Sequence, residues 1–473
     1  MWVVVLAACA GQFLVVLDIS VVNVALPSIR AELGMDAAGL QWVVNAYTLT
    51  FAGFLLLGGR AGDLFGRKRM FLAGLGLFTV ASLAAGLAQQ PWQLLAARAV
   101  QGVGAAVLAP STLTLLTTSV PEGAARARAI GTWTAVGAGG GAAGGFIGGV
   151  LTEALSWRWV LLVNVPIGAL VLVAVAFRLA DDRAAGEADR GAGDRGRQPP
   201  AEDTRRLDVP GAVLVTGGLA SVAYGIVQTE AAGWTAAATL VPLLGGLALL
   251  AVFVAVEART RAPLMPLRLF RLPSVSGANA AMFVCGAAMV SSWYFMSLYM
   301  QNVLGFTALQ AGLGFIPHSL SIVTGSKLAP RLMPLLGTRN TALVGVVLAT
   351  AGFLWQSGMD ADGGYLGSVL GPGLVMMFGN GLMSTPLASL ATSGAPREDA
   401  GVVSAVMNTS RTMGGTLGLA VLSTIASSRI TGDTPHALAP GYALAFRTGS
   451  AALVGCLLLI LLTLPREGRR TAR

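Results

Sequence analysis

The chain has 473 residues, of which 55% are hydrophobic and only 11% are charged, and its mean hydropathy is +0.72. Soluble domains carry about 25% charged residues, so this composition excludes a water-soluble protein and indicates an integral membrane protein. A net charge of +9 would suggest a nucleic-acid partner in a soluble protein. In a membrane protein the same excess is typical of cytoplasmic loops, and we expect no nucleic acid.

The apolar segments are continuous and about 20 residues long, which predicts helices rather than the alternating strands of a membrane barrel. Fourteen such segments follow one another along the chain. The expected spans are 2–27, 39–59, 70–88, 92–118, 127–152, 158–178, 208–228, 236–256, 273–298, 309–329, 340–358, 364–390, 400–427 and 446–464.

The distribution of basic residues predicts the orientation. An even number of spans puts both termini on one side of the membrane. The loops on that side carry 25 of the 31 Lys and Arg, and the opposite loops carry four, namely Arg30, Arg158, Arg429 and Arg447. Both termini are therefore expected in the cytoplasm. The preference for Arg over Lys suggests a GC-rich bacterial genome, and hence a bacterial cell membrane.

A polar stretch divides the chain between the sixth and seventh spans. It is rich in Gly, Pro and Ala and carries seven basic and seven acidic residues between Arg178 and Arg206, which predicts a solvated linker. If the two spans at 208–256 are set aside, six spans precede them and six follow. The expected units are an N-terminal six-helix bundle at 1–178, a cytoplasmic linker at 179–207, two additional spans at 208–256, and a C-terminal six-helix bundle with a cytoplasmic tail at 257–473.

Three charged residues lie well inside spans: Asp18, Arg98 and Arg411. A charge at mid-helix costs about 2.5–3.5 kcal/mol on insertion scales, so such residues face a water-filled cavity or a partner. At roughly 1.5 Å of rise per residue, Asp18 lies about 13 Å and Arg98 about 9 Å below the outer ends of their helices. The two residues therefore lie at a similar depth and could form a pair. A carboxylate that exchanges a proton beside a permanently charged guanidinium could couple proton movement to transport. A purely structural ion pair is the alternative.

Several side chains are candidates for a substrate pocket. Methionine and tryptophan at helical spacing in the span 273–298 suit a pocket that accepts varied apolar molecules, although a packing or lipid-facing stripe is the alternative. Arg411 could hold backbone carbonyls, an anionic substrate group or Asp18. The candidate pocket comprises Asn23, Met289, Trp293, Met296, Asn380, Asn408 and Arg411.

A short charged hairpin joins the second and third spans and reads Gly59-Arg-Ala-Gly-Asp63-Leu-Phe-Gly66-Arg67-Lys68. It resembles the signature loop of the major facilitator superfamily of secondary transporters, Gly-x-Leu-x-Asp-x-x-Gly-Arg-Lys, with Ala61 in place of the Leu. The resemblance implies that Gly59, Asp63, Gly66, Arg67 and Lys68 form a conformational latch.

Three further segments are similar to the fourteen-span drug:proton antiporter branch of that family. They are Leu17-Asp18-Ile-Ser20-Val-Val-Asn23-Val-Ala-Leu-Pro27, Leu94-x-x-x-Arg98-Ala-Val-Gln101-Gly102-Val-Gly104 and Trp157-Arg158-Trp159-Val-Leu-Leu-Val-Asn164-Val-Pro166. The resemblance covers essentially the whole chain and is densest over 17–168. It implies that Asp18, Arg98 and Gln101 couple transport to protons.

The fifth span departs from the branch. Its antiporter motif, Gly-x-x-x-Gly-Pro-x-x-Gly-Gly, appears here with Gly145 in place of the proline, among Gly140, Gly144, Gly148 and Gly149. Small residues at this spacing let helices approach closely, but the fixed proline kink is lost. Import is therefore kept as an alternative to export.

The resemblance implies an all-α integral membrane protein with the major facilitator fold, in which two six-helix bundles flank two extra central helices. It implies a monomer that exports small amphipathic molecules, such as drugs or antibiotics, in exchange for protons by alternating access. A nutrient or metabolite importer is the alternative, and a non-transporting membrane sensor is a remote one. The sequence shows no metal-ligand cluster, nucleophile–base pair or nucleotide-binding loop, so no enzyme, cofactor or metal is expected. The expected partners are a small-molecule substrate, protons and the lipid bilayer.

Overall fold

The computed structural model of the chain describes residues 2–120, 124–178, 208–260, 263–264, 267–393 and 400–464. The predicted linker at 179–207, Arg397 and the tail from Arg466 lie outside these residues.

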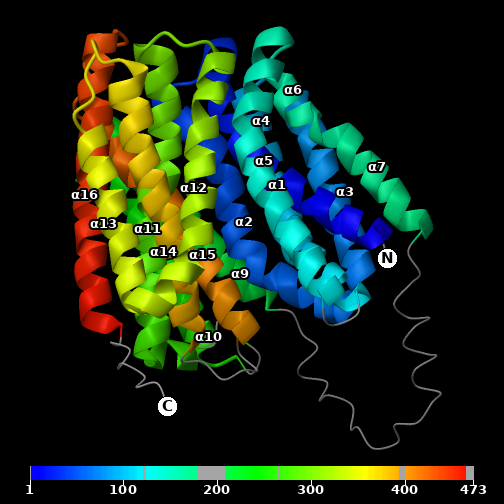
Figure 1. The fold of residues 1–473 in the computed structure, drawn as a ribbon. Coiled ribbons are helices and arrows are strands. Elements are labelled where there is room, and N and C mark those ends of the chain that lie inside the picture. The colour runs from blue at the N-terminus through cyan, green and yellow to red at the C-terminus, as the bar shows by residue number, and fades with distance from the viewer. Residues whose placement is uncertain are drawn as a thin grey trace, which may run out of the picture.

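The described residues are organised as helices, and the predicted all-α fold class is confirmed (Figure 1). The first half contains α1 (Trp2–Leu33), α2 (Ala37–Phe65), α3 (Arg67–Gly86), α4 (Pro91–Ser119), α5 (Ala124–Ala154), α6 (Arg158–Leu162) and α7 (Asn164–Arg178). A pair follows, α9 (Val209–Ala232) and α10 (Ala237–Glu257). The second half contains η2 (Leu267–Arg271), α11 (Pro273–Leu298), η3 (Tyr299–Val303), α12 (Ala308–Leu336), α13 (Thr338–Gln356), η4 (Leu366–Leu370), α14 (Gly371–Ser393), α15 (Ala400–Ser427) and α16 (Pro435–Thr463).

Nine helices within the described residues are long and apolar enough to cross a membrane, and the count of fourteen spans stays a prediction. Several predicted boundaries are wrong because an apolar window finds only the apolar part of a helix. The helix α12 continues to Leu336, and α16 begins at Pro435, before the predicted 446. Arg447, which the sequence placed in a loop, therefore lies inside α16, where it is exposed.

Two connections also differ from the prediction. The expected loop at 60–69 is helical on both sides of Gly66, since α2 ends at Phe65 and α3 begins at Arg67. Gly66 makes this one-residue reversal with φ of 95°, a conformation that glycine adopts without steric cost. The sixth span is broken at Val163, between α6 and α7.

The helix ends gather at two faces of the bundle, which we name after one glycine in each. The Gly34 face, uppermost in Figure 1, holds the connections 34–36, 87–90, 155–157, 304–307, 357–365 and 428–434. The Gly66 face holds Gly66, Gly337 and both ends of the described chain.

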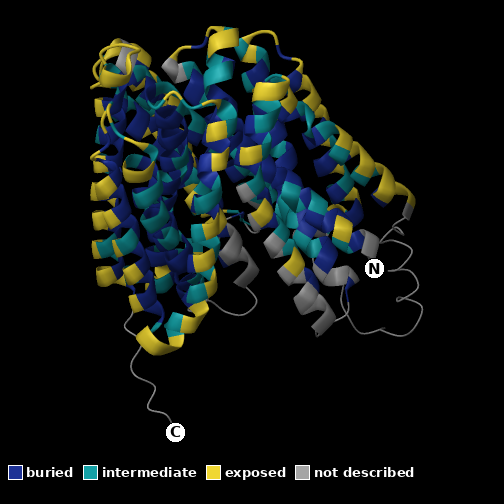
Figure 2. Ribbon diagram, turned by 45° about the horizontal axis from the view of Figure 1, so that its top comes forward, coloured by how far each residue is buried: buried dark blue, intermediate teal, exposed yellow. Residues whose placement is uncertain are grey.

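The two halves are joined near the Gly34 face. One hydrophobic cluster contains both Leu26 of α1 and Leu298 of α11, whereas Leu14 of α1 belongs to a cluster made by the first half alone. Toward the Gly66 face the halves diverge (Figures 1 and 2). The helix α1 therefore contributes to a core shared by both halves near its end, and to a core of its own half nearer its start.

Polar contacts reinforce this junction. Ser297 Oγ donates to the Asn23 carbonyl (2.8 Å), and Gln301 Nε2 donates to the Val24 carbonyl (3.1 Å). Arg30 and Asp433 form an ion pair of 3.3 Å at the Gly34 face itself. Each of these contacts links α1 to the second half.

The additional helices lie at the seam between the halves. Leu49 of α2, Leu219 of α9 and Ala420 of α15 belong to one hydrophobic cluster, and Trp42 of α2 contacts Tyr224 of α9 with ring centroids 6.3 Å apart. The helix α10 packs outside α9 and exposes apolar side chains such as Leu244. The pair therefore contacts both halves along one side of the molecule.

Glycines bring α5 and α12 together on the other side of the molecule. A Cβ on Gly312 would overlap the Gly145 carbonyl oxygen, and a Cβ on Gly149 would lie 2.6 Å from the Ala308 carbonyl oxygen. Leu309 N also donates to Glu153 Oε2 (3.2 Å). The backbones of the two halves are in direct contact here.

The substitution Gly312→Ala should separate α5 from α12. The added methyl group has no room beside the Gly145 carbonyl, and overpacking of this kind costs about 1–3 kcal/mol. We expect the population open at the Gly34 face to grow, which pulsed EPR would detect as a longer distance between spin labels on Ala31→Cys and Thr434→Cys.

The matched control is Gly139→Ala on α5, where nothing lies within 4 Å of the added carbon. This variant should leave the label distance unchanged. An unchanged distance in Gly312→Ala as well would contradict the tight α5–α12 contact.

Candidate functional site

The structure places Asp18 and Arg98 side by side inside the first half. Arg98 Nη1 donates to Asp18 Oδ2 at 2.5 Å. Asp18 is 0% exposed and Arg98 1%, so water does not reach the pair in this conformation. The pairing expected from their common depth is present, and it connects α1 to α4.

Two amides complete the environment of the carboxylate. Asp18 Oδ1 accepts from Gln101 Nε2 (2.8 Å) and from Asn164 Nδ2 (2.9 Å). Gln101 also donates to Ser82 Oγ (2.8 Å) and accepts from Arg98 Nη1 (2.8 Å). Both carboxylate oxygens are therefore hydrogen-bonded, one of them to the cation and the other to neutral donors.

The helix α2 fixes the guanidinium from the other side. Arg98 Nε donates to the Val43 carbonyl (3.1 Å), and its guanidinium carbon lies 4.4 Å from the centre of the Tyr47 ring. A cation over an aromatic face is attracted by the ring's quadrupole. Gly102 permits this approach of α4, because a Cβ there would overlap the Tyr47 carbonyl oxygen.

Sequence reasoning missed Asn164, Ser82 and Tyr47 as partners of the charged pair. Asn164 is fully buried at the first position of α7, after the break at Val163. The signal for it was available, since Asn164 falls in a segment already noted for its similarity to the antiporter branch. Ser82 and Tyr47 carry no such signal, because polar residues are common on helices.

A carboxylate held in this way can serve as a proton site only if the donors around it rearrange. Protonation removes the charge that Arg98 neutralises, and a guanidinium does not release its own proton in proteins. The arrangement therefore couples the charge of one side chain to contacts made by α1, α2, α3, α4 and α7.

The glycines of the fifth span serve two contacts. Gly140, Gly144 and Gly148 pack against α1, and a Cβ on Gly144 would lie 2.5 Å from the Ser20 Cβ. Gly145 and Gly149 instead face α12. Gly145, at the position where the branch has proline, therefore lies at the contact between the halves.

The residues predicted as a latch surround the one-residue turn at Gly66. Gly59 lies on α2, Arg67 begins α3, and Lys68 is buried. The side chain of Asp63 is outside the described set. The latch therefore stays a prediction.

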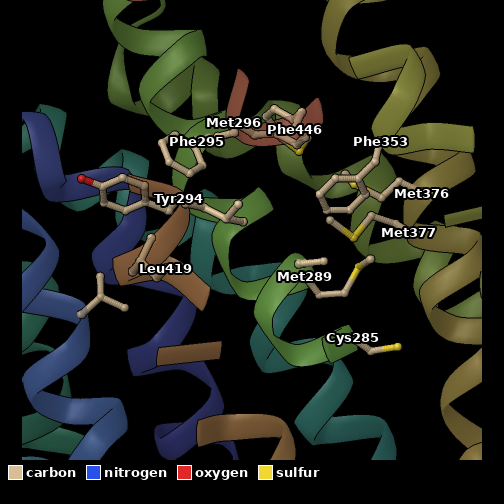
Figure 3. Packing of buried hydrophobic residues seen from close by; sticks show 14 of the residues in the cluster. Cys285, Met289, Tyr294, Phe295, Met296, Phe353, Met376, Met377, Leu419 and Phe446 are labelled. Carbon is tan, nitrogen blue, oxygen red and sulfur yellow. The ribbon is translucent and has the colours of Figure 1, made fainter. Parts of the chain in front are cut away.

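The candidate pocket residues do not share one environment. Met289 (6% exposed) and Met296 (0%) lie in the hydrophobic core, where Figure 3 shows Met289 directed toward Met377. Trp293 is half-buried and packs against Phe315 with ring centroids 4.7 Å apart. These neighbours favour packing over substrate contact for the two methionines.

The polar candidates are more accessible. Asn408 and Arg411, both on α15, are exposed, and Asn380 on α14 is half-buried. Asn23 is half-buried, and its side chain donates to the Ile19 carbonyl (3.0 Å) in its own helix.

Comparison with known proteins identifies the family. The sequence model of the Major Facilitator Superfamily matches residues 8–419. The chain belongs to this superfamily. It is therefore a multi-pass membrane transporter, and the expectation of a transporter rather than an enzyme is confirmed.

Two similar proteins are named for the export of an antibiotic or for resistance to one. The chain is 50% identical over 466 residues to the cephamycin export protein CmcT of Amycolatopsis lactamdurans, covering 98% of this chain and 92% of that protein. It is 38% identical over 468 residues to the puromycin resistance protein pur8 of Streptomyces alboniger, covering 97% and 89%.

Solved structures share the fold at low sequence identity. The nucleoside transporter NupG matches with a TM-score of 0.68 at 10% identity, covering 98% of this chain and 100% of that one. An inward-facing, unoccupied bacterial homologue of the human lysosomal transporter Spinster matches with a TM-score of 0.63 at 16% identity, covering 98% and 95%. The predicted major facilitator fold is confirmed.

Removing one member of the buried pair should destabilise the protein more than removing both. Asp18→Asn leaves the Arg98 charge without a counter-ion, and breaking a buried pair in this way costs about 3–5 kcal/mol. The double variant Asp18→Asn/Arg98→Gln should recover most of that loss in a thermal unfolding series in detergent.

The pair Glu32–Arg158 provides the control. Its atoms lie 2.7 Å apart, but the Arg158 side chain is 26% exposed and that of Glu32 50%, so the coupling in Glu32→Gln/Arg158→Gln should be about 0–1 kcal/mol. If the coupling energy between Asp18 and Arg98 were as small as that of Glu32 and Arg158, the two buried residues would not depend on each other for stability.

Proposed function

We propose that this chain is a proton-coupled secondary transporter that exports small amphipathic molecules such as antibiotics. The observation that supports proton coupling best is the enclosed carboxylate of Asp18, which holds Arg98, Gln101 and Asn164 through its two oxygens. A change in its protonation alters contacts to three other side chains at once.

We propose that the Gly66 face is cytoplasmic, with both termini on that side. The predicted loops of that side carry 25 of the 31 Lys and Arg, as the positive-inside rule expects. In this orientation the joined Gly34 face is the outer side, and the conformation described above is closed toward the outside. The path for substrate would run between two halves of one chain, which supports a monomer as the working unit.

In the proposed cycle, the halves part at the Gly34 face and water reaches Asp18 from outside. Proton binding to Asp18 weakens its attraction to Arg98 and favours release of substrate to the outside. When the halves close again at the Gly34 face, the bound proton becomes accessible to the cytoplasm. One charge crossing 100 mV supplies about 2.3 kcal/mol, which corresponds to roughly 50-fold accumulation.

Export is favoured over import by the relatives. Proteins 50% and 38% identical along almost the whole chain are named for cephamycin export and puromycin resistance. Gly145 keeps the close contact with α12, so the loss of proline does not remove the junction between the halves. We propose that the residues around Gly66 latch the cytoplasmic ends of the helices when the outer side opens.

Asp18→Asn should abolish proton-coupled efflux while the protein still reaches the membrane. The amide keeps the shape of the side chain but cannot take up the proton. In cells that express the chain, efflux of cephamycin or puromycin should stop both in this variant and in wild type treated with a protonophore, as measured by intracellular drug.

The matched control is Glu32→Gln, which removes an acid from the same helix at an exposed position. It should retain protonophore-sensitive efflux. Undiminished proton-dependent efflux by Asp18→Asn would rule out the coupling role of Asp18.

A further inference from the structure

Arg411 is a cation without a described counter-ion in the middle of α15. At roughly 1.5 Å of rise per residue, it lies about 16 Å from the start of its helix. Its side chain is exposed, and no described acid forms an ion pair with it. A charge at this depth is costly in a membrane and normally faces a partner or a water-filled space.

The packing of α15 indicates which way this side chain faces. Gly414 and Gly418 lie against α11 of the same half, and Thr416 Oγ1 donates to Thr48 Oγ1 of α2 in the other half (3.0 Å). Met413 and Leu417 pack on the cluster formed with α9. At 100° per residue, the strip opposite α9 carries Asn408, Arg411 and Thr412.

This strip lies between a contact to one half and a contact to the other. It therefore faces the space between the halves rather than lipid. Asn408 and Arg411 are both exposed on it, while Thr416, one turn nearer the Gly34 face, is 1% exposed. The accessible part of the strip ends where the two halves meet.

The protein itself offers this guanidinium no described carboxylate. Asp18 is occupied by Arg98, Gln101 and Asn164. The described acids of the second half, Asp360, Asp362 and Asp433, all lie in connections at the Gly34 face.

We propose that Arg411 binds a carboxylate of the transported molecule, with Asn408 one turn away as a second polar contact. This rests on the transport function proposed above and narrows its substrates to amphipathic organic acids. The planar guanidinium presents paired N–H donors that match the two oxygens of a carboxylate, a geometry that an ammonium does not offer.

The test compares one acid with its neutral derivative. Cefoxitin, whose ionised group at neutral pH is a carboxylate, and its methyl ester are titrated into the full chain in phosphatidylcholine nanodiscs, which lack anionic lipid. Wild type should bind the acid more tightly than the ester. In Arg411→Gln the affinity for the acid should fall about 10- to 100-fold, as expected for loss of a charge-assisted hydrogen bond, while the affinity for the ester changes little.

Two further variants separate recognition from general charge. Arg411→Lys keeps the positive charge but lacks the paired N–H donors of the guanidinium, so it should retain part of the preference for the acid. Arg429→Gln makes the same substitution in the connection that follows α15, where the arginine is also exposed, and should keep the full preference. Binding of the ester to each variant reports that it is folded.

An equal affinity of wild type for acid and ester, or an undiminished preference in Arg411→Gln, would overturn the proposal. Neither result depends on proton coupling. Conversely, a clear preference for the acid together with efflux that a protonophore does not affect would leave the Arg411 site standing and remove the proton-driven mechanism.

Discussion

The burial of one carboxylate organises the first half of the protein. Asp18 is 0% exposed and lies within hydrogen-bonding distance of Arg98, Gln101 and Asn164. Burying a charge is unfavourable unless it is paired and hydrogen-bonded. Helices α1, α4 and α7 must therefore keep their relative positions for as long as Asp18 is ionised, and α2 and α3 support the same cluster through Tyr47 and Ser82.

Close backbone packing between α5 and α12 holds the two halves together. On α5, glycines spaced by four contact α1, and their neighbours Gly145 and Gly149 contact α12. The helix α5 thus packs against α1 of its own half with one face and against α12 of the other half with the adjacent face. The contact with α12 places the backbone of Gly145 against that of Gly312, and that of Gly149 against that of Ala308.

Much of this arrangement could be predicted from particular residues. The apolar windows located the helices, and the position of Asp18 and Arg98 within theirs predicted a common layer. Similarity to a known motif added Gln101. The same kind of similarity pointed to the segment that contains Asn164, but its contact with Asp18 depends on the break between α6 and α7, which a continuous apolar segment does not reveal.

The direction in which a side chain faces was less predictable. A rotation of one residue turns a helix by about 100°, so the sequence could not decide whether Met289 and Met296 face a cavity or the core. The structure places both in the core. It leaves Asn408 and Arg411 exposed, although the sequence predicted all four residues to line the substrate pocket. Helix ends were also misjudged, because polar residues such as Arg447 continue helices beyond their apolar part.

The position of α9 and α10 has a consequence for how molecules dissolved in the bilayer could arrive. The pair covers the seam formed by α2 and α15, so acyl chains and lipophilic compounds are kept from slipping between the bundles there. The opposite seam, between α5 and α12, has no such cover among the described helices. Near the Gly34 face this seam is closed by backbone contact. Lateral entry from lipid on this flank would therefore have to pass between α5 and α12 closer to the Gly66 face, where the halves diverge.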